Sequence, residues 1–281
     1  MDKITLSAPA KINLNLLVTG LRDDGYHLLS GVMQSLSLAD TVTVEKIQTG
    51  IVISCSKTGI PLDERNICHK AAKLYLEEAG LQGGVKITLI KAIPDGAGMG
   101  GGSSDGAAVL KAMKALYPAS VDLPAIAIRI GADVPFFLTG GTCICEGIGE
   151  KLTPIPFPCK SNLYCVVAKN CEGLSTPRIY KLFDELTRDT FSQRPLYPAA
   201  LNTPEQVFDM MQNDLELSAI SVRPEIAEMK ATLLNFGADA AMMTGSGSAV
   251  FGLFLSREKA QACEKALQNE KIEAHFCTLT D

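Results

Sequence analysis

The sequence is poor in histidine and has no set of cysteines spaced for a metal. Only three histidines occur in 281 residues, and no C-x-x-C pair is matched by a second such pair. Zinc centres are built from Cys and His sets of that kind, so their absence argues against one. The nine cysteines are odd in number and scattered. A chain of this size and apolar content does not depend on disulfides, so we expect reduced thiols and a cytoplasmic protein.

Long apolar runs and an excess of basic charge are also absent. No apolar run approaches the roughly 18 residues that a membrane-spanning helix needs. Lys3 and Lys11 interrupt the N-terminal stretch, so it lacks the pattern of a secretory signal. The net charge is -5 and the isoelectric point is about 5.4. This balance gives no electrostatic basis for binding nucleic acid, so we expect neither a membrane nor a nucleic-acid partner.

The composition is that of an ordinary globular enzyme or binding protein. Apolar residues make up 47 % of the chain and charged residues 20 %. The length is sufficient for two domains. Three prolines fall within residues 151–160, and such a run is typical of a crossing between domains. We therefore expect an N-terminal domain over 1–155 and a C-terminal domain over 156–281.

Hydrophobic patterning predicts strands and helices in both parts. In the N-terminal part, strands are expected over 10–18, 32–38, 41–47, 51–54, 85–90 and 142–145, and helices over 66–79, 104–117 and 123–130. In the C-terminal part, strands are expected over 163–168, 240–244, 249–255 and 272–277, and helices over 176–187, 204–217, 224–235 and 257–268. This second order is typical of a split βαβ, ferredoxin-like domain. The polar stretch 187–198 is expected to be an exposed loop.

One glycine-rich segment dominates the sequence. Six of the 24 glycines fall between positions 96 and 106, after an apolar run at 87–90 and before a helix-forming run. Glycine permits positive φ and close approach of the main chain to a ligand. We expect Ser103 and Ser104 to cap the new helix, whose first amides would then face an anion. The segment is predicted to hold phosphate.

Two common phosphate-binding loops do not fit this segment. Gly96-x-Gly98-x-x-Gly101 matches the dinucleotide fingerprint in form. That fingerprint requires an acidic residue at the end of a second parallel strand, and residues 116–122 are a helix end and a loop instead. A Walker loop requires a lysine directly after its glycines, and none is present.

Three motifs occur in a fixed order along the chain. The first is Pro9-Ala10-Lys11-Ile12-Asn13-Leu14, the second is the glycine segment, and the third is the glycine-rich stretch 243–251. Together they resemble the motifs of the GHMP kinases, which bind ATP in the second motif. The resemblance implies an α+β, two-domain architecture with a ribosomal-protein-S5-domain-2-like N-terminal domain and a ferredoxin-like C-terminal domain. It also implies ATP, supplied with Mg²⁺ as Mg-ATP.

Two further stretches narrow the resemblance to one branch of this family. Asp24-Gly25-Tyr26-His27 follows the first motif, and residues 131–137 match the catalytic segment of the branch. The branch acts in the non-mevalonate isoprenoid pathway and phosphorylates a hydroxyl of a cytidine-diphosphate-linked polyol. The resemblance implies a small-molecule substrate of that class. We expect the protein to be a monomer or a weak homodimer.

Asp133 is the candidate general base. Phosphoryl transfer needs one group that receives the proton of the attacking hydroxyl. Asp133 lies just past a predicted helix end at Gly131 and before Pro135, where a tight turn would aim its carboxylate. The residues alone leave a second possibility open, in which Asp133 caps the segment 134–138. The resemblance favours catalysis.

Lys11 is the second catalytic candidate. It shares a strand face with Asn13, so both side chains are expected in one cleft wall. An ammonium group near Asp133 would keep that carboxylate ionised and would stabilise charge on the reacting oxygens. The pattern also fits an ordinary surface lysine. The resemblance implies that Lys11 and Asp133 form the catalytic pair and that Asn13 binds near the substrate hydroxyl.

The resemblance also implies the residues that bind ATP. They are the glycine segment and two residues at the adenine end: Pro94, Asp95, Gly96, Ala97, Gly98, Met99, Gly100, Gly101, Gly102, Ser103, Ser104, Asn66 and Lys91. Ser104 is in addition the candidate Mg²⁺ ligand. A helix-capping Asn66 and an exposed strand-end Lys91 remain the alternatives. Asp105 would repel a triphosphate unless Mg²⁺ or a sugar hydroxyl lay between them.

Aromatic residues are expected to select the substrate. Tyr26 and His27 follow an Asp-Gly turn, so both are expected at a loop edge. The resemblance implies that Tyr26 stacks on cytosine and that His27 reads the base edge through its backbone. Thr176 and Tyr180 match the segment that closes the aromatic sandwich. Packing of Tyr180 on Phe183 within a helix is the alternative.

Three other functions are compatible with parts of this pattern. Another GHMP kinase, for homoserine, mevalonate or a sugar, would keep the glycine segment but lack Asp24-Gly25-Tyr26-His27. A non-catalytic sensor on the same fold would lose Lys11 or Asp133, and both are present. A dinucleotide-binding oxidoreductase would bind NAD in place of ATP.

Overall fold

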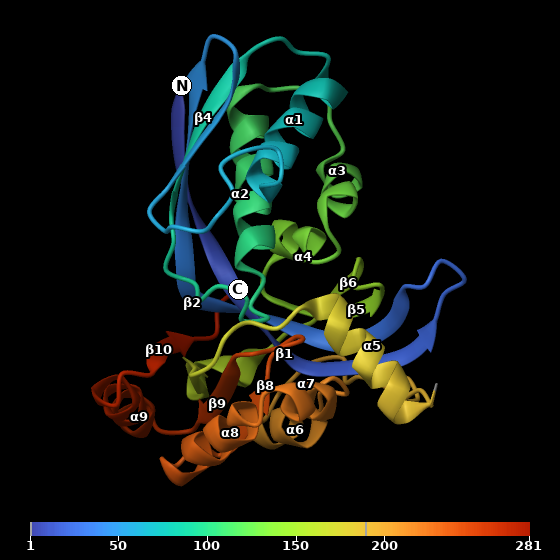
Figure 1. The fold of residues 1–281 in the computed structure, drawn as a ribbon, viewed down its shortest axis with the longest axis vertical. Coiled ribbons are helices and arrows are strands. Elements are labelled where there is room, and N and C mark those ends of the chain that lie inside the picture. The colour runs from blue at the N-terminus through green and yellow to red at the C-terminus, as the bar shows by residue number, and fades with distance from the viewer. Residues whose placement is uncertain (1, 189) are drawn as a thin grey trace. The chain divides into compact units, whose positions relative to one another are not determined.

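A computed structural model describes residues 2–188 and 190–281, and these form two compact units (Figure 1). Unit 1 comprises the residues up to Ala10, Ala39–Ile93 and Gly100–Thr139. Unit 2 comprises Lys11–Leu38, Pro94–Met99 and Gly140–Asp281. The chain therefore passes between the units several times, and the expected domain boundary near residue 155 stays a prediction.

Unit 1 combines strands with four helices. Its strand segments lie in β1 (Lys3–Leu21), β2 (His27–Ile47), β3 (Gly50–Cys55) and β4 (Gly84–Ile90). Its helices are α1 (Ile67–Ala79), α2 (Gly101–Leu116), α3 (Leu123–Ile130) and α4 (Val134–Thr139). Residues 41–47 of β2 pair antiparallel with β4, which pairs parallel with β3. Helices α1 and α2 pack side by side, with Gly106 facing Ile67.

Unit 2 contains the later parts of β1 and the first part of β2. Residues 29–34 of β2 pair antiparallel with β5 (Thr142–Gly147), which pairs with β6 (Lys151–Pro154). A short 3₁₀ helix, η1, follows at Pro158–Asn162.

The rest of unit 2 is built on a four-stranded antiparallel sheet of order β10-β7-β9-β8. Its strands are β7 (Tyr164–Lys169), β8 (Ala240–Met243), β9 (Val250–Phe254) and β10 (Glu273–Thr278). The helices are α5 (Thr176–Thr187), α6 (Pro204–Met210), α7 (Glu216–Val222), α8 (Glu225–Asn235) and α9 (Arg257–Asn269). The strand order, with helices after the first and third strands, confirms the ferredoxin-like arrangement and the α+β class.

The strands at the N-terminus are longer than the sequence predicts. The expected strands 32–38 and 41–47 are parts of the single strand β2. Asp40 does not interrupt it, because its buried carboxylate accepts hydrogen bonds from the amides of Ala92 and Ile93 at 2.6 and 2.9 Å. A polar residue that finds partners inside the protein need not mark a turn.

The predicted helix over 204–217 is wrong. The structure has α6 and α7 there, separated by the irregular residues 211–215. The main chain of Gln212 and Asp214 forms hydrogen bonds with Leu16 of β1 instead of continuing a helix. The apolar pattern alone did not reveal these bonds to a distant strand.

The stretch 187–198 is only partly the exposed loop that was expected. Leu196 is fully exposed, but Tyr197 is half-buried and donates its hydroxyl to Oδ1 of Asn15 at 2.8 Å. Asp189 lies outside the described residues. Over 2–188 and 190–281, no helix is long and apolar enough to cross a membrane.

Candidate active site

The first part of the glycine segment, Pro94–Met99, is held by main-chain hydrogen bonds within unit 2. Three of its carbonyl oxygens accept amides from the other two motifs: Gly96 from Ser248 at 3.3 Å, Ala97 from Ala249 at 3.4 Å and Met99 from Lys11 at 3.0 Å. The three motifs that the sequence spaces over more than 200 residues therefore meet in one place.

Both the backbone angle and the lack of room for a side chain require glycine at position 98, where the second and third motifs meet. Gly98 has φ +70°, and a Cβ on it would lie 2.2 Å from the carbonyl oxygen of Thr244. No side chain tolerates so short a contact with a main-chain atom. The close approach is the reason for the glycines in the second and third motifs.

Thr244 connects the motifs through its hydroxyl. Its Oγ1 accepts a hydrogen bond from the amide of Asn13 at 3.1 Å and lies 3.5 Å from the carbonyl oxygen of Gly98, to which it donates. Thr244 is fully buried. No local pattern around Thr244 indicates this role, because its partners lie far away in the sequence.

Lys11 and Asn13 are brought together as expected. The Nζ atom of Lys11 donates to Oδ1 of Asn13 at 2.5 Å, and the two residues are 3 % and 6 % exposed. The alternative of an ordinary surface lysine is therefore wrong. Burying an ammonium group costs free energy unless the group is hydrogen-bonded, and the bond to Asn13 supplies part of that compensation.

Helix α2 begins earlier than predicted and without serine caps. Its N-cap is Gly100, with φ +71°, and no side chain caps the helix. Ser103 and Ser104 lie inside the first turn, so the expectation that they cap the helix is wrong. The amide of Ser104 makes the first intrahelical bond, to the carbonyl of Gly100 at 2.8 Å, and the amides that precede it are of the kind that suits an anion.

The hydroxyl of Ser104 fits a role as a ligand. Its Oγ is buried, and within the described residues it has no hydrogen-bond partner. Such an orphaned oxygen is one suitable donor for Mg²⁺. Within the same residues, no group of three or more His, Cys, Asp or Glu side chains is arranged to hold a metal.

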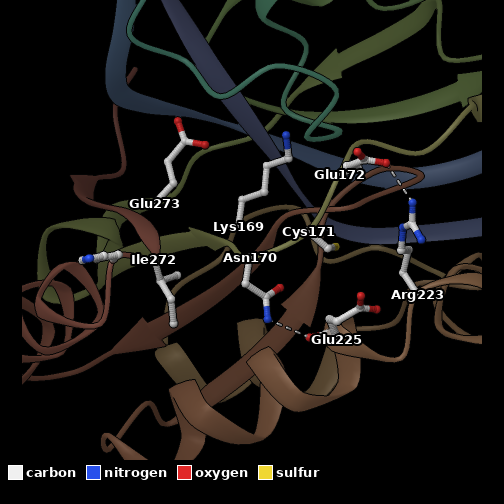
Figure 2. A pocket seen from close by; sticks show the side chains of 9 residues that line it. Lys169, Asn170, Cys171, Glu172, Arg223, Glu225, Ile272 and Glu273 are labelled. Atoms are coloured by element: carbon white, nitrogen blue, oxygen red, sulfur yellow. Dashed lines mark hydrogen bonds and ion pairs between the residues drawn. The ribbon is translucent and has the colours of Figure 1, made fainter.

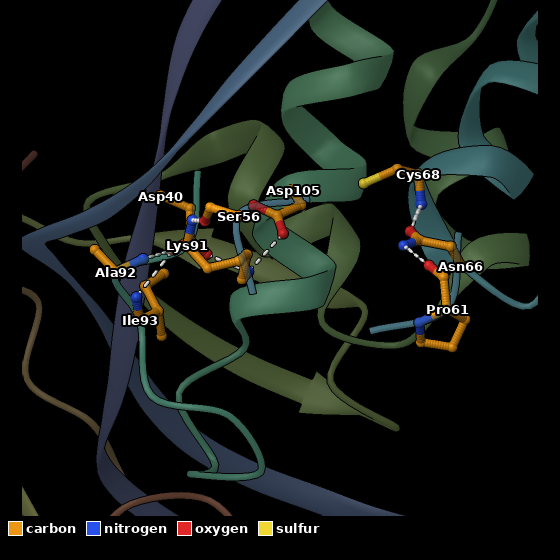
Figure 3. Close-up of polar contacts among 9 residues, drawn as sticks. All are labelled: Asp40, Ser56, Pro61, Asn66, Cys68, Lys91, Ala92, Ile93 and Asp105. Carbon is orange, nitrogen blue, oxygen red and sulfur yellow. Dashed lines mark hydrogen bonds and ion pairs between the residues drawn. The ribbon is translucent and has the colours of Figure 1, made fainter. Parts of the chain in front are cut away.

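Lys91 lies between two carboxylates in unit 1 (Figure 3). Its Nζ bonds to Oδ2 of Asp40 and, at 2.6 Å, to Oδ2 of Asp105. The three side chains are 4 % exposed or less. The carboxylate of Asp105 is therefore paired with Lys91 inside the protein. This pairing reduces the repulsion that Asp105 would otherwise exert on a triphosphate. A contact of Lys91 with ATP stays a prediction. If the main chain of Lys91 made that contact, the side-chain cluster would stay intact.

Burial dominates the protonation of this cluster. It raises the pKa of Asp105 to about 7, although the attraction of Lys91 opposes the shift and the charge of Asp40 adds to it. Burial lowers the pKa of Lys91, but the attraction of Asp105 and Asp40 outweighs it, and the net pKa is raised. Lys91 is thus the fixed charge of the cluster and Asp105 the group that titrates.

Asn66 has the structural role that the sequence left open. Its Oδ1 accepts the amide of Cys68 at 2.8 Å at the start of α1, and its Nδ2 donates to the carbonyl of Pro61 at 2.6 Å (Figure 3). Helix capping is confirmed, and a contact with ATP stays a prediction.

Asp133 lies in the turn between α3 and α4 of unit 1, as the sequence predicts. The turn is closed by the amide of Val134, which donates to the carbonyl of Gly131 at 3.1 Å. Asp133 is half-buried. Lys11 belongs to unit 2, and the pairing of Lys11 with Asp133 stays a prediction.

The residues expected at the substrate base lie in unit 2. Tyr26 is 59 % exposed at a turn, as expected, whereas His27 begins β2 with its side chain largely buried. The Nε2 atom of His27 lies 2.7 Å from Oδ1 of Asp184, and its ring stacks on Tyr180 with 4.7 Å between centroids. A loop-edge position is therefore wrong for the His27 side chain. The sequence analysis missed Asp184, whose polar pairing no local pattern signals.

Thr176 and Phe183 are placed on the same helix. The Oγ1 atom of Thr176 lies 2.8 Å from Oγ of Ser246 in the third motif. Phe183 meets the ring of His27 edge-on at 6.2 Å between centroids. His27 is thus packed against both aromatic side chains of α5, and Tyr180 has a ring partner other than Phe183.

A separate hollow of about 690 Å³ lies at the end of β7 (Figure 2). Side chains of both charges line it, among them Lys169, Glu172 and Arg223. The Nζ atom of Lys169 donates to the carbonyl oxygen of Asp95 at 2.5 Å. The glycine segment thereby has a side-chain anchor in addition to its main-chain bonds.

Known proteins match this chain along nearly its whole length. The family profile described as GHMP kinases N terminal domain matches residues 66–141, and that described as GHMP kinases C terminal matches residues 198–273. A protein of Clostridium botulinum (strain Alaska E43 / Type E3), named 4-diphosphocytidyl-2-C-methyl-D-erythritol kinase, is 41 % identical over 98 % of this chain and 99 % of its own. The chain belongs to the GHMP kinases. A protein of the same name from Clostridium novyi (strain NT) is 43 % identical over 96 % of this chain and 97 % of its own.

Solved structures of GHMP kinases agree with this assignment. A crystal structure of 4-(cytidine 5'-diphospho)-2C-methyl-D-erythritol kinase superposes with a TM-score of 0.83 at 37 % identity, covering 99 % of this chain and 100 % of the other. Homoserine kinase from Cytophaga hutchinsonii gives 0.74 at 20 % identity, over 99 % of this chain and 95 % of its own. At this low identity, the similarity to homoserine kinase shows a shared fold and no more. The expected GHMP kinase architecture is confirmed.

Asp105 should make stability depend on pH. Its pKa is about 7 in the folded protein and ordinarily 3.8, so the folded state retains a proton that the unfolded state releases. This contribution to stability is present at low pH and is lost as pH rises through about 7. In Asp105→Asn the free energy of unfolding, relative to the wild type, should therefore rise by about 1–3 kcal/mol between pH 5 and 8.

Chemical denaturation at the two pH values measures this difference. Asp23→Asn is the matched control, because Asp23 is exposed. If Asp105→Asn and the wild type lose stability in parallel between pH 5 and 8, Asp105 is not the group that titrates.

Proposed function

We propose that this protein is an ATP-dependent kinase that phosphorylates the 2-hydroxyl of 4-diphosphocytidyl-2-C-methyl-D-erythritol and releases ADP. The observation that carries the proposal is the junction of the three motifs, where the amide of Lys11 donates to the carbonyl of Met99 at 3.0 Å and the hydroxyl of Thr244 donates to the carbonyl of Gly98 at 3.5 Å. The substrate is the one for which the two clostridial relatives are named. The reaction is a step of the non-mevalonate isoprenoid pathway, in the cytoplasm, by a monomer or a weak homodimer.

In the proposed reaction, Asp133 is the general base. It accepts the proton as the O–H bond of the substrate breaks, and the same oxygen forms a bond to the γ-phosphorus of ATP. The bond from that phosphorus to the β-phosphate oxygen breaks, and ADP leaves. Lys11 stabilises negative charge on the reacting oxygens, and Asn13 orients Lys11 through their hydrogen bond.

The glycine segment holds the phosphates in this proposal. Main-chain amides of 96–104 and the first turn of α2 supply donors without a side chain between them and the ligand. Mg²⁺ would neutralise phosphate charge, with the hydroxyl of Ser104 as its protein ligand. Asn66 and Lys91 line the adenine end.

The cytidine end is bound by aromatic stacking. We assign Tyr26 and Tyr180 to the two faces of the base, and stacking of this kind contributes about 1–3 kcal/mol per base. His27, packed against Tyr180 and held by Asp184, limits the freedom of that ring. Thr176 contacts the substrate at the first turn of α5.

Product analysis tests the proposal. Purified protein is incubated with Mg-ATP and, separately, with the cytidyl substrate, homoserine, mevalonate and a panel of sugars. Mass spectrometry should find a phosphorylated product from the cytidyl substrate alone. Consumption of homoserine, mevalonate or a sugar with the cytidyl substrate unmodified would make the chain a GHMP kinase of different specificity.

Replacing the proposed base should separate chemistry from binding. In Asp133→Asn, kcat should fall at least about a hundredfold, because the amide cannot accept the hydroxyl proton. The Kd for ATP, measured by calorimetry, should stay within about twofold of the wild type, because the substitution leaves the phosphate-binding main chain unchanged.

Asp122→Asn is the control for this substitution. Asp122 caps α3 in the same unit, and asparagine caps a helix equally well. A near-normal kcat in Asp133→Asn would remove Asp133 from the mechanism.

A further inference from the structure

Residues 212–216, which comprise the end of the irregular segment after α6 and the first residue of α7, bind two other parts of unit 2. On one side they hold β1, because the amide of Leu16 donates to Gln212 at 2.8 Å and the amide of Val18 to Oδ2 of Asp214 at 2.8 Å. On the other side they hold the third motif. We call residues 212–216 the clamp.

Asn213 makes the contacts of the clamp with the third motif. Its Nδ2 donates to the carbonyl oxygens of Met243 and Gly245, both at 2.9 Å, and its Oδ1 accepts the amide of Leu215 at 3.0 Å. The side chain is buried. Both donors of the carboxamide are thus used on the two residues that flank Thr244.

Glu216 adds a second contact at the same place. Its Oε2 accepts the amide of Met243 at 2.9 Å, and its Oε1 pairs with Lys230 at 2.5 Å. Main-chain groups on both sides of Thr244 are therefore fixed by the clamp. The hydroxyl of Thr244 is in turn placed between Asn13 and Gly98.

We infer that Asn213 is a positioning residue for ATP binding, acting through Thr244 on the glycine segment. The chemistry favours asparagine, because two carbonyl oxygens need two donors while the amide of Leu215 needs an acceptor. An aspartate of the same shape would keep the acceptor and turn an oxygen toward the two carbonyls. This inference rests on the proposed function, since it assumes that the glycine segment binds ATP.

Two variants test the role. Asn213→Asp replaces the donors at constant shape, and Asn213→Ala removes them without adding charge. In both, KM for ATP should rise at least about tenfold, because the third motif loses two buried hydrogen bonds. KM for the alcohol substrate should rise by a smaller factor than KM for ATP, because the third motif meets the proposed substrate residues through the contact of Ser246 with Thr176.

The matched control separates positioning from general loss of stability. Leu233→Ala removes a buried apolar side chain from the core of the same unit and removes none of the hydrogen bonds that join the motifs. Each variant is compared by thermal unfolding, by kinetics, and by calorimetric binding of a non-hydrolysable ATP analogue. Leu233→Ala should lose stability with KM for ATP within about twofold of the wild type.

The outcomes distinguish this inference from the proposed function. Normal ATP affinity in both Asn213 variants, an equal rise of KM in Leu233→Ala, or failure of both Asn213 variants to fold would each overturn the positioning role. A wild type that binds the analogue but phosphorylates another alcohol would overturn the proposed substrate and leave the role of Asn213 standing. A wild type that binds no ATP analogue would overturn both.

Discussion

The candidate site depends on the close approach of two main-chain segments, one in the second motif and one in the third. A Cβ on Gly98 would lie 2.2 Å from the carbonyl oxygen of Thr244, and a Cβ on Gly245 would lie 2.8 Å from the carbonyl oxygen of Gly98. Because neither residue has a side chain, the hydroxyl of Thr244 reaches both Gly98 and Asn13. The two glycines therefore let two main-chain segments of this chain pack together, in addition to the contact with phosphate that we propose for the glycine segment.

Charge is distributed in keeping with this arrangement. The protein is acidic overall, and a protein that handles phosphate must concentrate its cations locally. Lys91 pairs with Asp40 and Asp105. Asp40 also accepts the amide of Ile93, so these contacts fix the chain between the end of β4 and the glycine segment. Lys11 is also buried and donates to Asn13, and its proposed task is to stabilise the charge of the transferred group. Two buried lysines thus have different tasks, one structural and one proposed as catalytic.

Much of the fold followed from the sequence, and less of the site did. Helix α3 has the predicted bounds, and α1 ends at the predicted residue and begins one residue later than predicted, because periodicity is a local signal. The break at 211–215 was missed because Asn213 and Asp214 bind partners far away in the sequence. The partners of Lys91, Asp40 and Asp105, are also distant in the sequence. The sequence therefore predicted a contact of Lys91 with ATP but not its two ion pairs. The motifs predicted which segments form the candidate site, but they did not predict the hydrogen bonds that join those segments.

The close approach at Gly98 is tested most directly by ATP affinity. In Gly98→Ala, with folding verified by circular dichroism, calorimetry should show ATP bound at least about tenfold more weakly, because the methyl group separates the two motifs. Gly20→Ala is the control, since a Cβ there meets only ordinary contacts at 3.5 Å and beyond, and it should bind ATP as the wild type does. A folded Gly98→Ala variant with wild-type affinity for ATP would contradict the account.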